Sequence, residues 1–455
     1  MGKATGFMDY ERQDKEAQSP KMRLKHFQEF HTPLSKEEQE IQGARCMACG
    51  VPFCQSGQMI MGMASGCPLH NLVPEWNDLI YHGNWEEAYY RLKKTNNFPE
   101  FTSRVCPALC EAACTCGLNG DAVSVKANEY GIIENAYEMG YAAAKPVKVR
   151  TGKKVAVVGS GPSGLAAADL LNRRGHSVTV FEREDKPGGL LRYGIPNYRL
   201  PKNRLEEDVN AILKTGVDVK YGLKIGKDIT IQQLQEEYDA VLITIGASTD
   251  KKLGLEGEGA EGIFSAVQFL RNVGKNIIMD LTGKEVAVIG GGNVTMDAVR
   301  TAKRLGAKKV SVVYRRRVAD MTALPSEIEG AIAEGVEVQT LKAPAALDVD
   351  ENNQIKGIYV TPQMISSIKD GRASIKPTGE EDIYIPCDVL VVAIGQNIET
   401  KHFEEAGIPV NRGKIVTKSN GSIEGMPGVF AGGDCASGPA SVIKAIAGAK
   451  VAAAN

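Results

Sequence analysis

One local pattern occurs twice in this chain: a run rich in β-branched residues, a glycine-rich turn, a helix-forming stretch and a second β-branched run. The first copy reads KKVAVVGSGPSGLAAADLLNRRGHSVTVFE (residues 153–182), and the second reads KEVAVIGGGNVTMDAVRTAKRLGAKKVSVVYRRR (residues 284–317). A strand, a tight glycine turn and a helix in that order build the βαβ unit that binds dinucleotides. The repeat therefore predicts an α/β fold with two dinucleotide-binding units.

The first copy carries a complete G-x-G-x-x-G turn at Gly159, Gly161 and Gly164. In such a turn the first glycine permits the tight bend, the second lets the backbone approach a pyrophosphate, and the third lets the helix pack closely on the strand. The N-terminus of the following helix offers free N–H groups to the phosphates. Glu182 ends the second strand, where an acid holds a ribose hydroxyl. A purely structural turn is the alternative, but here the strand, the helix and the acid all occur in the required order.

The second copy differs at two places that bear on its ligand. Thr295 replaces the third glycine after Gly290 and Gly292, which predicts slightly looser helix packing. Its second strand ends in three arginines (315–317), and arginines at that place suit the 2′-phosphate of NADP. A solvated basic edge is the alternative. The predicted NADP contacts are Gly290, Gly292, Asn293, Val294, Thr295, Arg315 and Arg316.

Cysteine is distributed unevenly, because eight of the ten cysteines precede residue 117. The N-terminus lacks the apolar core of a signal peptide, and no apolar run is long enough to cross a bilayer, so we expect a cytoplasmic protein. The net charge of −1 gives no reason to expect binding to nucleic acid or to an anionic membrane surface. In a reducing compartment, dense cysteines indicate a metal site rather than disulfides.

The cysteine spacing is typical of iron–sulfur ligands. The first group reads C-x₂-C-x₄-C and is followed by Cys-Pro at 67–68, and the second group spans residues 106–116. Two 4Fe–4S clusters need eight ligands, and in two-cluster ferredoxins the cysteine before proline ligates the other cluster. A Cys₄ zinc site is the alternative, but zinc carries no electrons. One predicted ligand set is Cys46, Cys49, Cys54 and Cys114, and the other is Cys67, Cys106, Cys110 and a fourth group.

Two later stretches, PGGLLRYGIPNYRLPK (187–202) and GVFAGGD (428–434), resemble motifs of the two-dinucleotide flavoproteins with the glutathione-reductase-like fold. This resemblance implies FAD on the first unit, with Asp434 at its ribityl–phosphate part, and NADPH on a second unit inserted into the first. The implied FAD contacts are Gly159, Gly161, Gly164, Glu182, Gly189, Leu190, Gly433 and Asp434. The expected domains are a helical iron–sulfur domain (1–145), an FAD domain in two parts (146–254 and 389–455) and an NADPH domain (255–388).

The N-terminal third, including GKATGFMDYER (2–12), EFHTPLSKEEQEIQGARCMACGVPFCQSG (29–57) and TNNFPEFTSRVCPALCEAAC (95–114), resembles the small (beta) chains of NADPH-dependent glutamate synthase. The resemblance implies that NADPH is oxidised at FAD and that electrons pass through two 4Fe–4S clusters to a large chain, which makes glutamate from glutamine and 2-oxoglutarate. It also implies an oxygen ligand at Glu129 for the second cluster, although Cys116 competes for that role. The spacer 55–66 before Cys67 is longer than in some relatives.

Hydride transfer between two cofactors requires no acid or base from the chain, so we expect no catalytic side chain. Glu327 is expected to be a solvated acid at a helix N-terminus rather than a group that faces the nicotinamide. Two other functions are compatible with these motifs: a reductase of the same architecture, such as the large subunit of a ferredoxin:NADP oxidoreductase, and a zinc-stabilised scaffold that only docks partners. Visible absorption and metal content separate the scaffold from the two reductases.

Overall fold

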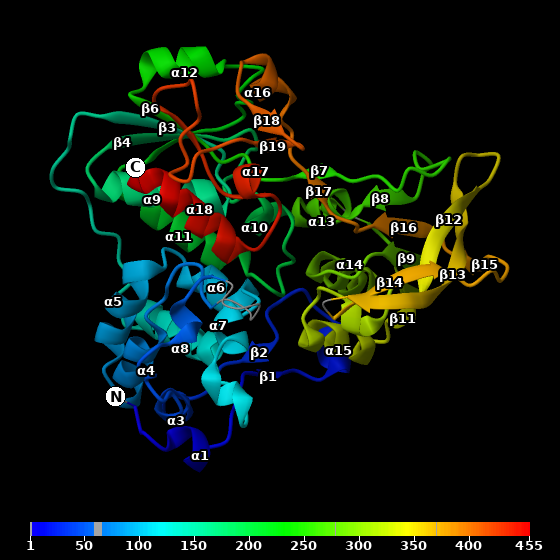
Figure 1. Ribbon diagram of the computed structural model, residues 1–455, viewed down its shortest axis with the longest axis horizontal. Helices are drawn as coiled ribbons and strands as arrows, with labels where there is room; N and C mark the ends of the chain where they lie inside the picture. Colours follow the sequence, from blue (N-terminus) through cyan, green and yellow to red (C-terminus); the bar gives the residue numbers. More distant parts are fainter. Residues whose placement is uncertain (1, 59–65, 278, 370) are drawn as a thin grey trace.

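The computed structural model describes residues 2–58, 66–277, 279–369 and 371–455. Figure 1 shows three units: a helical unit, a first α/β unit that carries the first glycine turn, and an inserted α/β unit that carries the second. The predicted two-dinucleotide α/β fold with an N-terminal helical domain is confirmed. Within the described ranges, no helix has both the length and the apolar character needed to cross a membrane.

The helical unit consists of short helices packed around the fully buried Trp76. One helix ends at Tyr81 and the next begins at Trp85, so the Gly-Asn pair at residues 83–84 separates two helices. The elements of this unit are α1 (Gly6–Asp9), α3 (Lys36–Ala44), η1 (Phe53–Gln55), α4 (Val73–Tyr81), α5 (Trp85–Thr95), α6 (Pro99–Val105), α7 (Leu109–Ala112), η2 (Thr115–Leu118) and α8 (Val125–Glu138).

An N-terminal arm, residues 16–32, leaves the helical unit and reaches the inserted unit (Figure 1). It contains β1 (Glu16–Ala17), α2 (Pro20–Arg23) and β2 (His31–Thr32), and the two strands pair antiparallel. The guanidinium of Arg23 lies 2.7 Å from the carboxylate of Glu334 in the inserted unit. The arm therefore bridges two units, which the assignment of residues 1–145 to a separate domain did not anticipate.

The first unit is a parallel five-stranded sheet in the order β20-β6-β3-β4-β5. Its strands are short apolar runs because helices and loops cover both faces of the sheet. The last strand, β20, joins the sheet only after the inserted unit has been completed. The strands of this sheet are β3 (Lys154–Val158), β4 (Ser177–Phe181), β5 (Asp218–Lys220), β6 (Ala240–Ile243) and β20 (Val429–Ala431). The helices are α9 (Pro162–Arg173), α10 (Leu190–Tyr193), α11 (Lys202–Lys214), α12 (Ile231–Glu237), α16 (Lys401–Glu405), α17 (Asp434–Ser437) and α18 (Val442–Ala454). A hairpin of β18 (Val410–Asn411) and β19 (Lys414–Ile415) completes the unit.

The inserted unit combines a parallel sheet, in the order β11-β10-β9-β16-β8, with an antiparallel sheet that projects at the right of Figure 1. The parallel strands are β8 (Ile263–Ser265), β9 (Glu285–Ile289), β10 (Lys309–Tyr314), β11 (Glu337–Thr340) and β16 (Val389–Val392). The antiparallel strands are β12 (Lys342–Val349), β13 (Ile355–Lys369), β14 (Arg372–Pro377) and β15 (Ile383–Pro386). The helices are α13 (Ala266–Gly274), α14 (Asn293–Arg304), η3 (Val318–Asp320) and α15 (Pro325–Ala333).

The boundary expected at residues 388–389 lies a few residues too early. β16 begins at Val389 but pairs with β9 and β8 of the inserted unit rather than with the first sheet. The two connections between the units run together, as β7 (Thr249–Asp250) pairs antiparallel with β17 (Gln396–Asn397). The chain therefore returns to the first unit at β17, because the buried β16 completes the second sheet.

Candidate functional site

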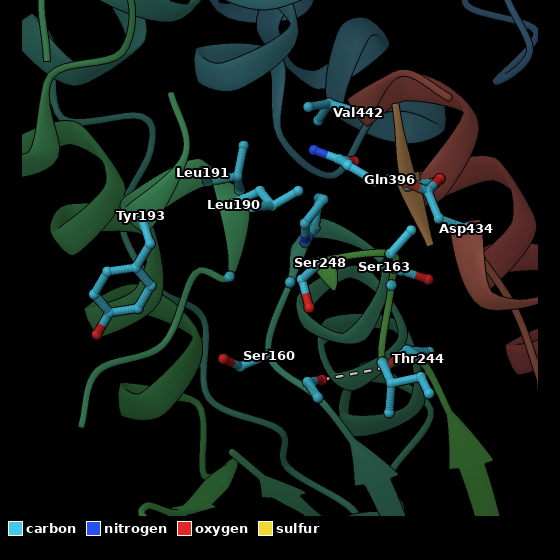
Figure 2. A pocket seen from close by; sticks show the side chains of 18 of the residues that line it. Ser160, Ser163, Leu190, Leu191, Tyr193, Thr244, Ser248, Gln396, Asp434 and Val442 are labelled. Carbon is cyan, nitrogen blue, oxygen red and sulfur yellow. Dashed lines mark hydrogen bonds between the residues drawn. The ribbon is translucent and has the colours of Figure 1, made fainter. Parts of the chain in front are cut away.

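A cavity of about 320 Å³ lies where the first unit meets the inserted unit (Figure 2). The first unit contributes the turn 159–163, Glu182 and Leu190 to its lining. The inserted unit contributes Asn293 and Val294, the first two residues of α14. The first glycine turn and the start of the helix that follows the second turn therefore border the same cavity.

Close backbone contacts explain the glycines of the first turn. Gly159 has a φ of +100°, a conformation that side-chain-bearing residues rarely adopt. A Cβ atom on Gly164 would lie 1.9 Å from the carbonyl oxygen of Gly159, and one on Gly189 would lie 3.0 Å from the Cα of Gly161. The turn, the start of α9 and the start of α10 therefore approach one another as closely as glycine permits.

Glu182 follows the C-terminal end of β4, as predicted, and lines the cavity although it is only 5% exposed. Its carboxylate accepts hydrogen bonds from the backbone N–H of Ser160 at 3.0 Å and of Glu184 at 2.8 Å. The hydroxyl of Ser160 donates to the same carboxylate. Glu182 thus ties the glycine turn to the end of β4 and presents its charge at the cavity.

Several polar atoms in the cavity wall lack a protein partner, which provides a test of whether a flavin dinucleotide fits. Within the described residues, Ser163 Oγ, Ser441 Oγ and Asp434 Oδ1 are buried and accept or donate no hydrogen bond. Burial raises the pKa of Asp434 to about 6. Hydroxyls and a carboxyl group beside a helix N-terminus suit the phosphates and ribityl hydroxyls of FAD, so the donor set fits this group.

The second turn differs from the first at its third position, where a threonine replaces the glycine. Gly290 has a φ of +149°, and Thr295 is fully buried. The hydroxyl of Thr295 accepts a hydrogen bond from the N–H of Gly292 at 3.3 Å. The threonine side chain fills the space at this turn and satisfies one of its backbone donors, and the slightly looser packing of the helix stays a prediction.

The three arginines after β10 have different surroundings. Arg315 is exposed, whereas Arg316 Nε donates to the carbonyl of Ala373 at 3.0 Å. Arg317 Nε lies 2.8 Å from the carboxylate of Asp320, and the hydrogen bond from this guanidinium lowers the pKa of Asp320. Of the two arginines predicted to contact NADP, Arg315 is the one that the protein leaves exposed and Arg316 also supports β14.

The first predicted set of cysteines lines one small cavity in the helical unit: Cys46, Cys49, Cys54 and Cys114. Cys116 lines the same cavity, and a hydrogen bond between its thiol and Cys114 lowers the pKa of Cys114 to about 6. Burial raises the pKa of Cys46 to about 11 and that of Cys54 to about 12. The structure therefore places Cys116 beside the first set and not beside the second.

The second predicted set lies at the boundary between the helical unit and the first unit: Cys67, Cys106, Cys110 and Glu129. Burial raises the pKa of Cys67 to about 11 and that of Cys106 to about 12, and the charge of Glu129 raises both further. Burial also raises the pKa of Glu129 to about 8, and Glu129 accepts a hydrogen bond from the hydroxyl of Thr102 at 2.5 Å. These four groups therefore interact electrostatically as one set.

Thiols gathered in two buried or partly buried groups have the donor chemistry that iron–sulfur clusters require, so the residues fit these clusters. Across the described ranges, no three His, Cys, Asp or Glu side chains converge closely enough to hold a single metal ion. Part of the unusually long spacer before Cys67, residues 59–65, lies outside the described residues.

The second set adjoins the large cavity. Val105 and Pro107, the two neighbours of Cys106 in the chain, both line that cavity. The cavity is therefore bordered by all three units: the first glycine turn, the start of α14 in the inserted unit and the two neighbours of Cys106 in the helical unit.

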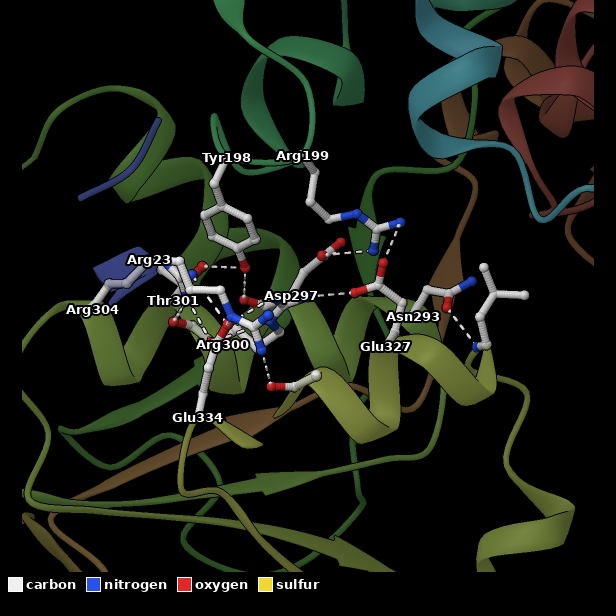
Figure 3. A network of polar contacts seen from close by, with 12 residues as sticks. Arg23, Tyr198, Arg199, Asn293, Asp297, Arg300, Thr301, Arg304, Glu327 and Glu334 are labelled. Carbon is white, nitrogen blue, oxygen red and sulfur yellow. Dashed lines mark hydrogen bonds and ion pairs between the residues drawn. The ribbon is translucent and has the colours of Figure 1, made fainter. Parts of the chain in front are cut away.

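Sequence reasoning missed a group of charged residues between the units, shown in Figure 3. This inter-unit network consists of Arg23, Arg199, Asp297, Arg300, Arg304, Glu327 and Glu334. The expectation that Glu327 is solvated is wrong, because its carboxylate is largely buried and pairs with Arg199 at 3.4 Å and Arg300 at 2.7 Å. The spacing of Asp297, Arg300 and Arg304 on one face of α14 is the sequence signal that could have indicated a charged contact.

Comparisons with known proteins agree with this architecture. The pyridine nucleotide-disulphide oxidoreductase family matches residues 153–449, and the family described as dihydropyrimidine dehydrogenase domain II, 4Fe–4S cluster, matches residues 23–141. Among solved structures, FprA of Mycobacterium tuberculosis in complex with NADPH is similar with a TM-score of 0.56 and 22% identity over 66% of this chain and 84% of that one. Thioredoxin reductase of Lactococcus lactis has a TM-score of 0.52 and 20% identity over 66% of this chain and 97% of that one. These structures support the fold alone.

Relatives match along nearly the whole chain. The glutamate synthase [NADPH] small chain of Bacillus subtilis (strain 168) is 40% identical over 98% of this chain and 96% of that protein. The small chain of Escherichia coli (strain K12) is 34% identical over 98% of this chain and 97% of that protein. The fold and the matched domains define a pyridine-nucleotide oxidoreductase joined to a 4Fe–4S domain. Within that class, the chain belongs to the glutamate synthase small-chain family.

Proposed function

We propose that this chain oxidises NADPH with bound FAD and passes the electrons through two 4Fe–4S clusters to a glutamate synthase large chain, which makes glutamate from glutamine and 2-oxoglutarate. The observation that carries the proposal is the lining of the large cavity. It joins the glycine turn of the first unit, the start of α14 in the inserted unit and the two neighbours of Cys106. A hydride donor, a hydride acceptor and an electron exit would thus meet in one place.

The residues that would hold FAD are those of the first turn together with Glu182 and Asp434. The free N–H groups at the start of α9 face the phosphate region, and Glu182 offers a carboxylate for a ribose hydroxyl. The unpartnered Ser163, Ser441 and Asp434 would gain hydrogen bonds on binding. When bound, FAD supplies a two-electron acceptor for hydride, and the clusters supply one-electron carriers.

The residues that would hold NADPH are the turn at Gly290–Thr295 and the exposed Arg315, with Arg316 beside it. Relatives are named for either nucleotide: those of B. subtilis and E. coli for NADPH, and that of Schizosaccharomyces pombe for NADH. The arginines after β10 favour NADPH here, because a guanidinium matches the geometry and charge of a 2′-phosphate.

The cysteines would hold two clusters rather than one. Cys46, Cys49, Cys54 and Cys114 would hold the first. Cys67, Cys106, Cys110 and Glu129 would hold the second, because Cys116 lines the cavity of the first set while Glu129 interacts with the second. The carboxyl group of Glu129 is held in place by the hydroxyl of Thr102 and the amide of Asn96.

The names and lengths of relatives support a large-chain partner. Several bacterial relatives are named small chains. In S. pombe the matching region is 35% identical to 97% of this chain but makes up only 22% of a protein named glutamate synthase [NADH]. The region that corresponds to this chain is there fused to a much longer polypeptide.

Anaerobic co-purification with a candidate large chain tests the whole proposal. We expect NADPH oxidation that depends on glutamine and 2-oxoglutarate, and broad iron–sulfur absorbance that NADPH bleaches. NADPH oxidation that requires an added ferredoxin and ignores glutamine would instead indicate the ferredoxin:NADP type of reductase. A bare flavin spectrum with bound zinc would contradict the cluster assignment.

Iron analysis of single variants tests the ligand sets. The intact chain should bind about eight iron atoms, as two 4Fe–4S clusters require. Cys49→Ser and Cys110→Ser should each lose about half of that iron. Cys116→Ser is the matched control and should retain all of it. If Cys116→Ser loses iron and Glu129→Gln does not, the fourth ligand has been assigned to the wrong residue.

A further inference from the structure

The inter-unit network joins the first unit to the inserted unit through Arg199 (Figure 3). A separate charged contact between the same two units pairs Glu184 with Arg271 and Lys275. Arg199 comes from the loop between α10 and α11 of the first unit, and its side chain is only 8% exposed. One guanidinium nitrogen lies 3.0 Å from the carboxylate of Asp297 and the other lies 3.4 Å from that of Glu327. A single arginine fork thus connects the first unit to two helices of the inserted unit, α14 and α15.

The position of this fork relates it to the cavity. Arg199 and Asp297 both line the cavity, and Asp297 lies about one helical turn after Asn293, the first residue of α14. The hydroxyl of Tyr198 donates to the backbone carbonyl of Asp297 at 3.2 Å, which adds a second contact from the same loop. The loop 198–199 therefore holds the N-terminal half of α14, the helix that follows the second glycine turn.

The other end of the network is held by the N-terminal arm. The carboxylate of Glu334 lies 2.7 Å from each of Arg23, Arg300 and Arg304. The ring of Phe30, also in the arm, lies 5.1 Å from the guanidinium of Arg300. The arm and the loop 198–199 thus contact α14 from two directions, and Arg300 joins the two contacts because it also pairs with Glu327 at 2.7 Å.

Removing the fork would leave the buried carboxylate of Asp297 without its ion-pair partner and that of Glu327 with Arg300 alone, a state that is far less favourable than the intact network. Water would have to enter between the units to solvate them, so the inserted unit would lose its fixed orientation over the cavity. The second glycine turn and Arg315, by contrast, belong wholly to the inserted unit, so nucleotide binding there would persist. The expected consequence is slow hydride transfer with nearly normal nucleotide affinity.

We propose that Arg199 is a positioning residue: it fixes α14, and with it the second nucleotide turn, over the cavity of the first unit, and Arg23 of the N-terminal arm braces it through Glu334 and Arg300. This inference rests on the proposed oxidation of NADPH at FAD and adds to it the residue that aligns the two nucleotide units. Through this arm, the helical unit helps to hold the two nucleotide units in a fixed relative orientation.

Arg204 provides a matched control. It also belongs to the first unit and pairs with two carboxylates, those of Glu134 at 2.6 Å and Glu207 at 2.8 Å. Its partner Glu134 lies in the helical unit, so this ion pair joins two units without contacting α14 or α15. Arg199→Met and Arg204→Met therefore each remove an arginine that pairs across a unit boundary, at different boundaries, and Arg199→Lys restores the charge without the fork.

Stopped-flow kinetics and hydrogen exchange of the holoprotein test the proposal. In anaerobic stopped-flow reduction, Arg199→Met should reduce its flavin about 10- to 100-fold more slowly than wild type, while its dissociation constant for NADPH changes by less than about threefold. Its isotope effect with NADPH deuterated at the transferred position should increase, because hydride transfer limits the rate more strongly. Without any nucleotide, hydrogen exchange of α14 and α15 should be faster in Arg199→Met and Arg23→Met and unchanged in Arg204→Met.

Partial recovery of the rate in Arg199→Lys would support the positioning role. Wild-type rates and exchange in Arg199→Met, or an equal loss in Arg204→Met, would overturn it. If Arg199→Met cannot be purified with FAD, Arg199→Lys and Arg23→Met carry the same test with smaller expected changes. A wild-type protein whose flavin is not reduced by NADPH would refute the proposed function itself, and the exchange experiment would still decide whether Arg199 holds the units together.

Discussion

The two α/β units begin with the same local pattern but are completed by different contacts. In the first, Gly164 is required because its Cα lies against the carbonyl of Gly159. In the second, Thr295 stands at the equivalent place, fully buried, and its hydroxyl accepts the N–H of Gly292. The first pattern is followed by the buried Glu182 and the second by the exposed Arg315. We infer from this difference that the shared turn sets the class of ligand and that the residues around it distinguish the two proposed ligands.

The two units also differ in how they are attached. The first unit shares one apolar core with the helical unit, in which Phe98, Phe101 and Cys106 pack with residues of α9 and α18. Ion pairs join the inserted unit to its neighbours: those of the inter-unit network and those of Glu184 with Arg271 and Lys275. Apolar attachment is tolerant of small shifts, whereas buried ion pairs require fixed partners. The position of the inserted unit is thus more strictly defined by its contacts than that of the helical unit.

The two units should differ most in how much stability they lose when the residue at the third position of each turn, Gly164 or Thr295, is replaced. Gly164→Ala places a Cβ atom 1.9 Å from the carbonyl oxygen of Gly159, so the helix or the turn must move. We expect a loss of at least about 3 kcal/mol in the free energy of unfolding and loss of FAD. Thr295→Ala should cost only about 1 kcal/mol, because it removes one hydrogen bond and little volume. Thermal unfolding and the FAD content of purified protein measure both, and equal losses would mean that the turns are equivalent after all.

Charge reversal after β10 should affect the second unit alone. Arg315→Glu with Arg316→Glu should raise the KM for NADPH by about 10- to 100-fold, since two guanidinium contacts to a 2′-phosphate are replaced by repulsion. The KM for NADH should change far less. Arg315→Glu alone separates nucleotide contact from the support that Arg316 provides to Ala373. Lys309→Glu, at the opposite end of β10, is the control, and equal effects on both nucleotides would exclude a 2′-phosphate contact.

A smaller effect, on the pH dependence of the free energy of unfolding, should appear at the boundary between the helical unit and the first unit. Asp208 on α11 is buried at this boundary and accepts a hydrogen bond from the hydroxyl of Tyr137 at 2.7 Å. Burial and the nearby Glu100 raise the pKa of Asp208 well above its ordinary value of 3.8. Because folding raises this pKa, the stability that Asp208 contributes is complete below pH 3.8 and decreases as the pH rises.

Asp208→Asn removes this titration. Relative to wild type, it should gain stability as the pH increases from 4 to 8, reaching on the order of 1 kcal/mol. Chemical unfolding at a series of pH values measures the difference. Glu207→Gln, an exposed neighbour on the same helix, should show no such trend. A constant difference between wild type and Asp208→Asn at all pH values would contradict the raised pKa.

Local features of the sequence were sufficient for the architecture. Glycines at 159, 161 and 164, the acid at 182 and the break at residues 83–84 act through backbone conformation and nearest neighbours, so their consequences follow from the sequence around them. The division into a helical domain and two nucleotide units followed from these local features. The spacing of the cysteines similarly identified two groups of thiols before any contact was known.

Contacts between distant segments were decided only by the tertiary structure. The resemblance favoured Glu129 but left Cys116 as a competitor, whereas the fold places Cys116 beside Cys114 and Glu129 beside Cys106. Glu327 was expected in solvent, but Arg199 and Arg300 surround it in the interior. The pairing of Arg23 with Glu334 joins residues 311 positions apart. No local spacing encodes such a contact, because it arises only when separately formed units are packed against one another.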